Sequence, residues 1–345
     1  MELLGGLNFF DERATHSVSL GVSCSRPIIP PMKLTTLVLF ALGVFATSVA
    51  EAAWDRNRIK PLSDDKKAKV QESLPAKSLA KPKKDRRVLV FYRCEGFVHG
   101  SIAAGNYAVK ELGKKTKAFS ADIADEYSVF TKENLAKYDA ILFNNTTHLA
   151  FQNDDQRNAV LEFMKQGKGV AGIHAASDNF YKWKAGARMV GGQFDGHPWG
   201  SGGTWSFKLD DPQHVLNRAF DGKGFWHKDE IYQYKPGTFV GADEIRVLIS
   251  LDLSKDQTMS PLKRNDGLRK QYTEGGRYVP VSWLRKFEGG RVFYSNLGHN
   301  ESTFWNKAVL KHYLDGVQYA LGDLAADATP SSKIKRKAVL APAKP

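Results

Sequence analysis

Cysteine is nearly absent from this chain, whose 345 residues include only Cys24 and Cys94. Cys24 precedes a stretch with the pattern of an export signal, so one thiol is expected in the processed protein. A single thiol excludes an internal disulfide and a cysteine-rich metal site. Cys94 follows a strand-like run and is a nucleophile by residue type, but nothing else beside it supports that role.

Long apolar runs are also scarce, and the exception lies near the N-terminus. Residues 32–52 read MKLTTLVLFALGVFATSVAEA, with one lysine, an apolar run and the small-residue pattern Ala50-Glu51-Ala52. This pattern predicts a cleavable signal peptide over 32–52, a mature start near Ala53 and a secreted or periplasmic protein. The run is short for a membrane span, so a retained N-terminal anchor is the less favoured alternative. Residues 1–31 form an upstream extension, and whether they are translated stays open.

Acidic residues are too few to balance the basic ones, and the chain carries a net charge of +13. The excess lies at the ends, since residues 53–87 hold 12 basic and 5 acidic side chains, whereas 88–324 hold 30 and 27. A near-neutral body argues against a nucleic-acid partner. We expect a basic flexible linker over 53–85, a globular domain over 86–322 and a basic disordered tail over 323–345.

The expected domain alternates two kinds of pattern. Strand-like runs at 88–93, 138–145 and 168–173 alternate with helical patterns at 101–114 and 153–167. This alternation predicts an α/β fold with a mostly parallel central sheet and helices on both faces. Beyond Gly191 the pattern loosens into a loop-rich insert with short β segments, including 246–251. Two strands joined at 288–290 and a helix over 304–321 complete the prediction.

Histidines recur directly after the predicted strands. Four of the nine occupy such places: His99, His148, His174 and His299. Ligands of parallel sheets bind beyond the carboxyl ends of the strands, so this repetition favours a shared cleft. His197 and Glu230 lie in the insert and are expected to fold over the same face. For any one histidine, a hydrogen-bonded structural role is the alternative.

Six ordered segments resemble a known family. They read YRCEGFVHGS from residue 92, NNTTH from 144, GIHAASDNFY from 172, GGQFDGHPWG from 191, KDEIY from 228 and GGRVFYSNLGHNE from 289. In this order they resemble the ThuA-like proteins, the trehalose-utilisation family, over about Arg86 to Leu321. The resemblance implies a flavodoxin-like fold, similar to that of the class I glutamine amidotransferases.

The amidotransferase comparison implies a lost nucleophile. In that pattern a cysteine occupies a sharp turn after a strand, and a later His-Pro-Glu run supplies the base and its orienting carboxylate. Here the turn has His174 in place of the cysteine, and the later run reads His299-Asn300-Glu301. Imidazole does not readily replace a thiolate in forming a thioester, so glutaminase activity is not expected.

The chemistry that remains is that of histidine and glutamate. We expect acid–base catalysis by His174, His299, Glu230 and His99. A bound divalent metal such as zinc is an open alternative, with His174, His197 and His299 as ligands, although the sequence has no HExxH-type signature.

Polar and aromatic residues beside the motifs favour a polyhydroxylated substrate, because aromatic faces stack on sugar rings and amides bind hydroxyls. The expected substrate-binding residues are Asn145, Asp178, Trp199, His197 and Asn300. We therefore predict an exported protein that processes a disaccharide, glycoside or keto-sugar, as a hydrolase or isomerase. A paired-carboxylate glycosidase is less favoured, since only Glu230 lies in a well-placed carboxylate motif. A non-catalytic carbohydrate-binding protein or an envelope scaffold is the alternative; the sugar, the reaction and the oligomeric state stay open.

Overall fold

The computed structural model of the chain describes residues 54–274 and 278–344. The predicted upstream extension and signal peptide therefore lie outside the described residues. Within the described part, no helix combines the length and the apolar character needed to cross a membrane.

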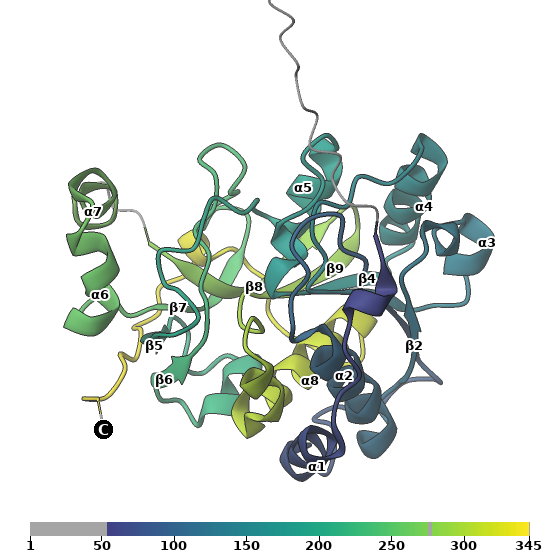
Figure 1. Ribbon diagram of the computed structural model, residues 1–345, viewed down its shortest axis with the longest axis horizontal. Helices are drawn as coiled ribbons and strands as arrows, with labels where there is room; N and C mark the ends of the chain where they lie inside the picture. The colour runs from purple at the N-terminus through teal and green to yellow at the C-terminus, as the bar shows by residue number, and fades with distance from the viewer. Residues whose placement is uncertain (1–53, 275–277, 345) are drawn as a thin grey trace, which may run out of the picture. The chain divides into compact units, whose positions relative to one another are not determined.

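A nine-stranded sheet runs through the centre of the described fold, in the order β2-β1-β3-β4-β9-β8-β7-β5-β6 (Figure 1). The first five strands pair in parallel: β2 (Ser120–Ala124), β1 (Arg87–Phe91), β3 (Ala140–Asn144), β4 (Gly169–Ile173) and β9 (Gly290–Ser295). The remaining strands pair antiparallel: β8 (Pro280–Phe287), β7 (Arg246–Leu251), β5 (Thr204–Leu209) and β6 (Phe225–Lys228). The sheet is mixed, so the expectation of a mostly parallel sheet is wrong for this half.

Local turn chemistry explains where the sheet changes direction. Strands β8 and β9 form a hairpin closed by Glu288 and Gly289, whose φ angles of 47° and 83° are both positive. A two-residue turn with two positive φ angles matches the right-handed twist of antiparallel strands. The insert then adds β7, β5 and β6 beyond β8. Strand β7 coincides with the β segment expected at 246–251, whereas the loose pattern beyond Gly191 did not locate β5 and β6.

Helices cover both faces of the sheet (Figure 1). One face carries α1 (Asp64–Ser73), α2 (Ile102–Thr116) and α8 (Lys307–Leu321), and the other carries α3 (Lys132–Leu135), α4 (Asp154–Lys165) and α5 (Lys184–Val190). Two further helices, α6 (Asp256–Lys263) and α7 (Asp266–Thr273), lie beside the antiparallel half. Alternate residues of β1 enter different cores, Val88 and Val90 on one face and Leu89 and Phe91 on the other, because successive strand side chains point in opposite directions.

Residues 54–85 fold onto the domain instead of forming the expected flexible linker. Ser63 caps the N-terminus of helix α1: its hydroxyl accepts a hydrogen bond from the Lys66 amide, and two aspartates occupy the first turn of the helix. Val70 is fully buried, and the Ser73 hydroxyl donates to the Trp305 carbonyl at 2.8 Å. A few buried apolar side chains among the charged residues are thus enough to hold this segment against the domain.

The C-terminal tail also differs from the expected disorder. Val339 pairs with Leu209 through two backbone hydrogen bonds of 3.0 and 2.9 Å, and the Ala341 amide donates to Asp252 at 2.9 Å. Farther back, Asp327 pairs with the buried Arg246 at 3.1 Å. The tail therefore follows the surface of the antiparallel half as an extended segment.

Candidate functional site

His174 occupies a sharp turn at the carboxyl end of β4. It directly follows Ile173, the last residue of that strand, and opens the 3-10 helix His174–Ser177. Its φ of 47° is left-handed, a conformation that costs a non-glycine residue about 1–3 kcal/mol. This is the strand–turn–helix geometry that presents the nucleophile in α/β hydrolases, and here it presents an imidazole.

The packing around this turn requires a glycine on the neighbouring loop. A Cβ atom added to Gly298 would lie 2.7 Å from Ile173 Cγ2 and 3.3 Å from His174 Cβ, and Gly298 itself has a φ of 131°. Both the crowding and the conformation exclude a larger residue. The loop that carries His299 can therefore approach His174 closely.

A single hydrogen bond fixes the tautomer of His174. Its Nδ1 lies 2.7 Å from the Asn296 carbonyl oxygen, which can only accept, so Nδ1 carries the proton. The ring is fully buried, and this burial, together with the nearby His99 and His299, lowers the pKa of His174 well below its usual range. The imidazole is neutral, and its Nε2 lone pair has no hydrogen-bond partner among the described residues.

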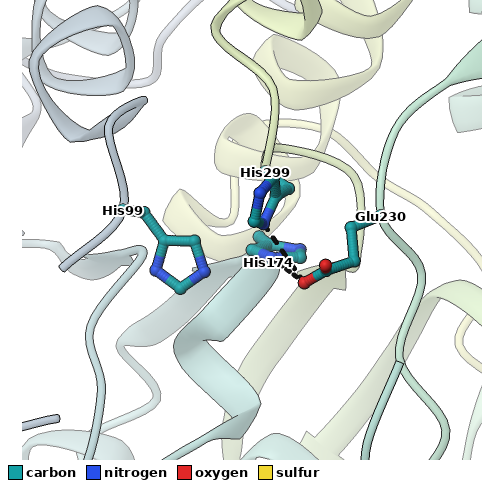
Figure 2. Close-up of side chains that lie close together, drawn as sticks. All are labelled: His99, His174, Glu230 and His299. Atoms are coloured by element: carbon teal, nitrogen blue, oxygen red, sulfur yellow. Dashed lines mark ion pairs between the residues drawn. The ribbon is translucent and has the colours of Figure 1, made fainter. Parts of the chain in front are cut away.

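Three further side chains meet His174 from different parts of the fold (Figure 2). One ligating atom from each of His99, His174, Glu230 and His299 lies within 4.8 Å of the others. Glu230 Oε1 is 3.2 Å from His299 Nδ1 and 3.9 Å from His174 Nε2. We call these four residues the histidine cluster. Three of them follow β1, β4 and β9, while Glu230 comes from the insert just after β6.

The imidazoles of the cluster differ in their affinity for protons. Burial lowers the pKa of His99 to about 3, and the neighbouring His299 and His197 act in the same direction. Burial alone would also lower the pKa of His299, but the Glu230 carboxylate beside it outweighs that effect and raises the pKa. The site thus holds two neutral imidazoles and one that protonates more readily.

Asp229 fixes the loop that carries His299. Its carboxylate accepts hydrogen bonds from the amides of Gly298 at 2.7 Å and Asn300 at 2.8 Å, on either side of His299. The Thr303 hydroxyl adds a third bond at 2.9 Å. Asp229 and Glu230 are neighbours in sequence, so one short segment holds both the backbone and the side chain of His299.

His197 contacts the cluster from outside. Its Nδ1 lies 3.3 Å from Glu230 Oε2, whereas His174 and His299 approach the other oxygen of that carboxylate, and its side chain is 52% exposed. Phe194 and Tyr232, also from the insert, pack beside it, with the Tyr232 ring centred 4.3 Å from that of His174. The insert therefore places two aromatic rings beside the cluster.

Most of the expected substrate-binding residues lie away from the cluster or bond to the surrounding loops. Trp199 is buried in the core, and its Nε1 donates to the Thr258 carbonyl, which corrects the expectation that it faces a ligand. Asn145 is also buried and donates to the Gly298 carbonyl at 3.3 Å, while Asn300 donates to two backbone carbonyls. Asp178 accepts from the Tyr181 hydroxyl and lies 3.7 Å from His148 Nε2. These residues shape the loops around the cluster.

One residue at the site escaped the sequence analysis. Phe97 is 63% exposed, and its ring is centred 4.8 Å from that of His99 and 6.5 Å from that of His299, nearly parallel to the latter. A lone aromatic in a loop has no periodic pattern, so only its place in the segment YRCEGFVHGS pointed to it. An exposed aromatic face beside these imidazoles is a suitable surface for a ligand ring.

Cys94, a nucleophile by residue type, and Glu301, from the amidotransferase comparison, both lie in surroundings that argue against a catalytic role. The Cys94 thiol is buried, lies 3.2 Å from the Asn145 carbonyl oxygen, and has a pKa raised to about 11 by burial. A catalytic thiol needs a lowered pKa, so Cys94 has the features of a structural cysteine. Glu301 forms an ion pair with Lys66 of α1, and Glu230 takes the place beside His299 that the comparison gave to Glu301.

Comparisons with known proteins identify the class of the chain. The family model described as ThuA, trehalose utilisation, matches residues 87–320, and the chain therefore belongs to this family. Among solved structures, it is similar to a ThuA-like protein from Bacteroides uniformis, with 20% identity, 70% of this chain and 94% of that chain covered, and a TM-score of 0.51. Another match is a ThuA-like protein from Parabacteroides merdae, with 17% identity, 71% and 93% coverage and a TM-score of 0.49. No curated protein matches.

Family membership associates the chain with carbohydrate utilisation. It assigns no sugar and no reaction, because one fold supports many chemistries.

Proposed function

We propose that this chain is an exported carbohydrate-processing enzyme that acts on a disaccharide, glycoside or keto-sugar through acid–base chemistry at the histidine cluster. One observation carries the proposal: three imidazoles and a carboxylate from distant segments meet at the carboxyl edge of the sheet. A protein that only binds sugar has no need to gather several imidazoles in one place. Export is supported by the signal-like pattern over residues 32–52.

The differing environments of the histidines support different roles for them in this proposal. His174 presents a neutral, unprotonated Nε2 and suits a general base. His299, whose pKa Glu230 raises, suits a general acid that returns the proton to a sugar oxygen. Paired groups with pKa values pushed apart are the usual arrangement for acid–base catalysis. Such a pair can catalyse proton transfer at a sugar hydroxyl or at a carbon next to a carbonyl group.

Phe97 supports a sugar as the class of substrate. Its exposed ring lies beside His99 and His299, so a sugar stacked on it would present its hydroxyls to the cluster. His197 is exposed and contacts the other oxygen of the Glu230 carboxylate, so it adds a second polar group beside the cluster.

The test is turnover of a sugar panel by the purified protein, followed by chromatography. The panel contains trehalose, other disaccharides, simple glycosides and their keto forms. We expect His299→Gln and Glu230→Gln to lower turnover at least 100-fold, the range for loss of a general acid or base, with melting temperatures within a few degrees of the wild type.

His148→Gln serves as the matched control, because this histidine also follows a strand but lies outside the cluster, with a side chain 43% exposed. It should retain the wild-type rate. Binding of a sugar with no change of any panel member would contradict the enzymatic proposal and favour a carbohydrate-binding protein.

A further inference from the structure

We propose that the histidine cluster binds a divalent transition-metal ion of the zinc type, with His99, His174, His299 and Glu230 as its ligands. The inference rests on the same side chains as the proposed function, and a bound ion would replace the direct acid–base roles of His174 and His299, because it occupies their lone pairs. It does not depend on which sugar, if any, is converted. Its ligand set differs from the one that the sequence favoured, since the buried His99 replaces the exposed His197.

The arrangement of the three rings is the first observation. Their centroids form a nearly equilateral triangle with sides of 4.9, 5.1 and 5.3 Å, and each pair of rings is nearly perpendicular, at 85°, 86° and 82°. Three imidazoles bound tetrahedrally at about 2.05 Å from zinc have ring centroids about 5.2 Å apart. Hydrophobic packing of three histidines alone does not require this triangle.

The second observation is a set of buried nitrogens that lack ordinary partners. His99 Nδ1 and His174 Nε2 are each buried and have no hydrogen-bond partner among the described residues, and His299 Nδ1 lies 3.2 Å from Glu230 Oε1. An unpaired buried polar atom is costly, and two within one cluster call for a common explanation. A cation would bind both of these lone pairs and, in exchange for a proton, the His299 nitrogen beside Glu230.

The surroundings of the cluster are those of a metal site. The Nδ1–H of His174 donates a hydrogen bond to the Asn296 carbonyl oxygen, which orients the ring with Nε2 toward the centre of the cluster. His99 Nε2 lies 3.3 Å from the Tyr232 hydroxyl. Such outer contacts orient metal-binding histidines. The Glu230 carboxylate supplies a negative charge, with Oε1 at 3.2 and 3.9 Å from the nearest imidazole nitrogens.

The distances allow closure on an ion. The four ligating atoms lie within 4.8 Å of one another, whereas the edges of a zinc tetrahedron are about 3.4 Å, so each side chain moves by less than about 1 Å. Imidazole-rich donors favour zinc and its transition-metal neighbours over Mg²⁺ and Ca²⁺, which prefer oxygen. A sugar oxygen would reach an ion held by all four residues only as a fifth ligand.

The test is metal binding by the full chain without any sugar. Protein stripped with a chelator is titrated with Zn²⁺ by calorimetry, and with Co²⁺ while the visible spectrum is recorded. We expect one ion per chain, visible absorption bands of the low-symmetry Co²⁺ site, and a melting temperature several degrees higher with Zn²⁺. His99→Gln and His299→Gln should each weaken Zn²⁺ binding at least 100-fold and remove the thermal shift.

His197→Gln is the matched control, since it removes a histidine that touches Glu230 but lies outside the assigned set. It should keep one ion per chain. Less than a tenth of an ion per wild-type chain, or binding that survives both ligand substitutions, overturns the metal site. If the chain binds no metal but sugar turnover depends on His299 and Glu230, the metal site is wrong and the proposed function stands. If the chain binds the metal but converts no sugar, the metal site stands and the proposed function is wrong.

Discussion

His174 combines three unusual features at one residue. Its left-handed backbone, its full burial and its single hydrogen bond to the Asn296 carbonyl together leave one lone pair aimed at the cluster. The strained backbone and the burial of a polar ring each cost stability when taken alone. Their combination at one residue is typical of functional sites, where strain and burial prepare a group for chemistry.

Phe97 provides a prediction at the residue scale. Phe97→Ala should weaken sugar binding about 5- to 50-fold, the effect of losing about 1–2 kcal/mol of stacking. The free energy of unfolding should change little, because the ring is 63% exposed. Isothermal titration with the best sugar of the panel measures the effect. Phe97→Trp, which keeps an aromatic face, should restore most of the affinity; unchanged binding in the alanine variant would remove Phe97 from the site.

Asp315 gives a pH-dependent prediction away from the cluster. Its carboxylate in α8 is buried without a hydrogen-bond partner among the described residues, and burial raises its pKa from 3.8 to about 7. The folded state therefore holds the proton more tightly than the unfolded state. This contribution to stability is complete below about pH 3.8 and is lost as the pH rises through about 7.

The substitution Asp315→Asn resembles the protonated side chain at every pH. It should stabilise the protein at pH 8 by a few kcal/mol at most and have little effect near pH 4. Thermal unfolding across this range checks the difference. An equal effect at both pH values would show that Asp315 does not titrate in this way.

At the scale of elements, the site is an assembly of loops that the sheet holds in register. The strands that precede His99, His174 and His299 were predicted because their apolar runs are continuous, as expected for strands buried on both faces. Their order in the sheet then brings the three loops together. The role of Glu230 could be anticipated only from the segment KDEIY, since its place beside His299 depends on how the insert pairs with the sheet.

The parts that sequence patterns missed have a common physical cause. Strands β5 and β6 lie at the antiparallel edge of the sheet and have only 6 and 4 residues. Over so few residues, an alternation of apolar and polar side chains is a weak signal. Helix α1 is strongly charged, and the segment that contains it is docked by Val70, Leu62 and Leu74. Composition therefore suggested a linker, although a few buried contacts determine the structure.

Asp229 gives the prediction for the element scale. Asp229→Asn keeps the shape of the side chain but weakens its hold on the amides of Gly298 and Asn300. We expect Asp229 to act as a positioning residue, so that turnover falls about 10- to 100-fold while KM changes little. A purely structural role of Asp229 would lower the melting temperature without a specific effect on kcat. The experiment therefore measures the melting temperature together with kcat and KM. A rise in KM with unchanged kcat would contradict the positioning role.

At the scale of the whole molecule, the segments at both ends of the described chain belong to the folded body. Val70 of α1 is fully buried, and near the other end Val339 pairs with Leu209 of β5. Both segments lie outside residues 87–320, which the family model matches. The stability of this chain therefore depends in part on contacts beyond the family domain.

Val70→Ala should lower the free energy of unfolding by about 1–3 kcal/mol, as expected for the loss of two buried methyl groups. Lys67→Ala, on the exposed side of the same helix, should stay within about 0.5 kcal/mol of the wild type. Chemical denaturation measures both. Equal stability of the two variants would indicate that residues 54–85 do not pack as described.

The described part of the molecule also contains a cavity away from the histidine cluster. This cavity of about 430 Å³ is lined by residues of the insert and of α7, among them Gln233, Tyr234, Phe239 and Tyr272. It is largely apolar and contains none of the four cluster residues. Sugar binding at the cluster and sugar binding in this cavity would therefore protect different segments of the chain.

Hydrogen–deuterium exchange with and without the best-binding sugar tests the central claim most directly, because it locates the ligand without requiring turnover. The account predicts added protection in the loops around residues 95–100, 174–178, 229–232 and 296–300. Protection confined to residues 233–241 and 271–274, or no change with any sugar of the panel, would contradict the claim that the histidine cluster is the functional site.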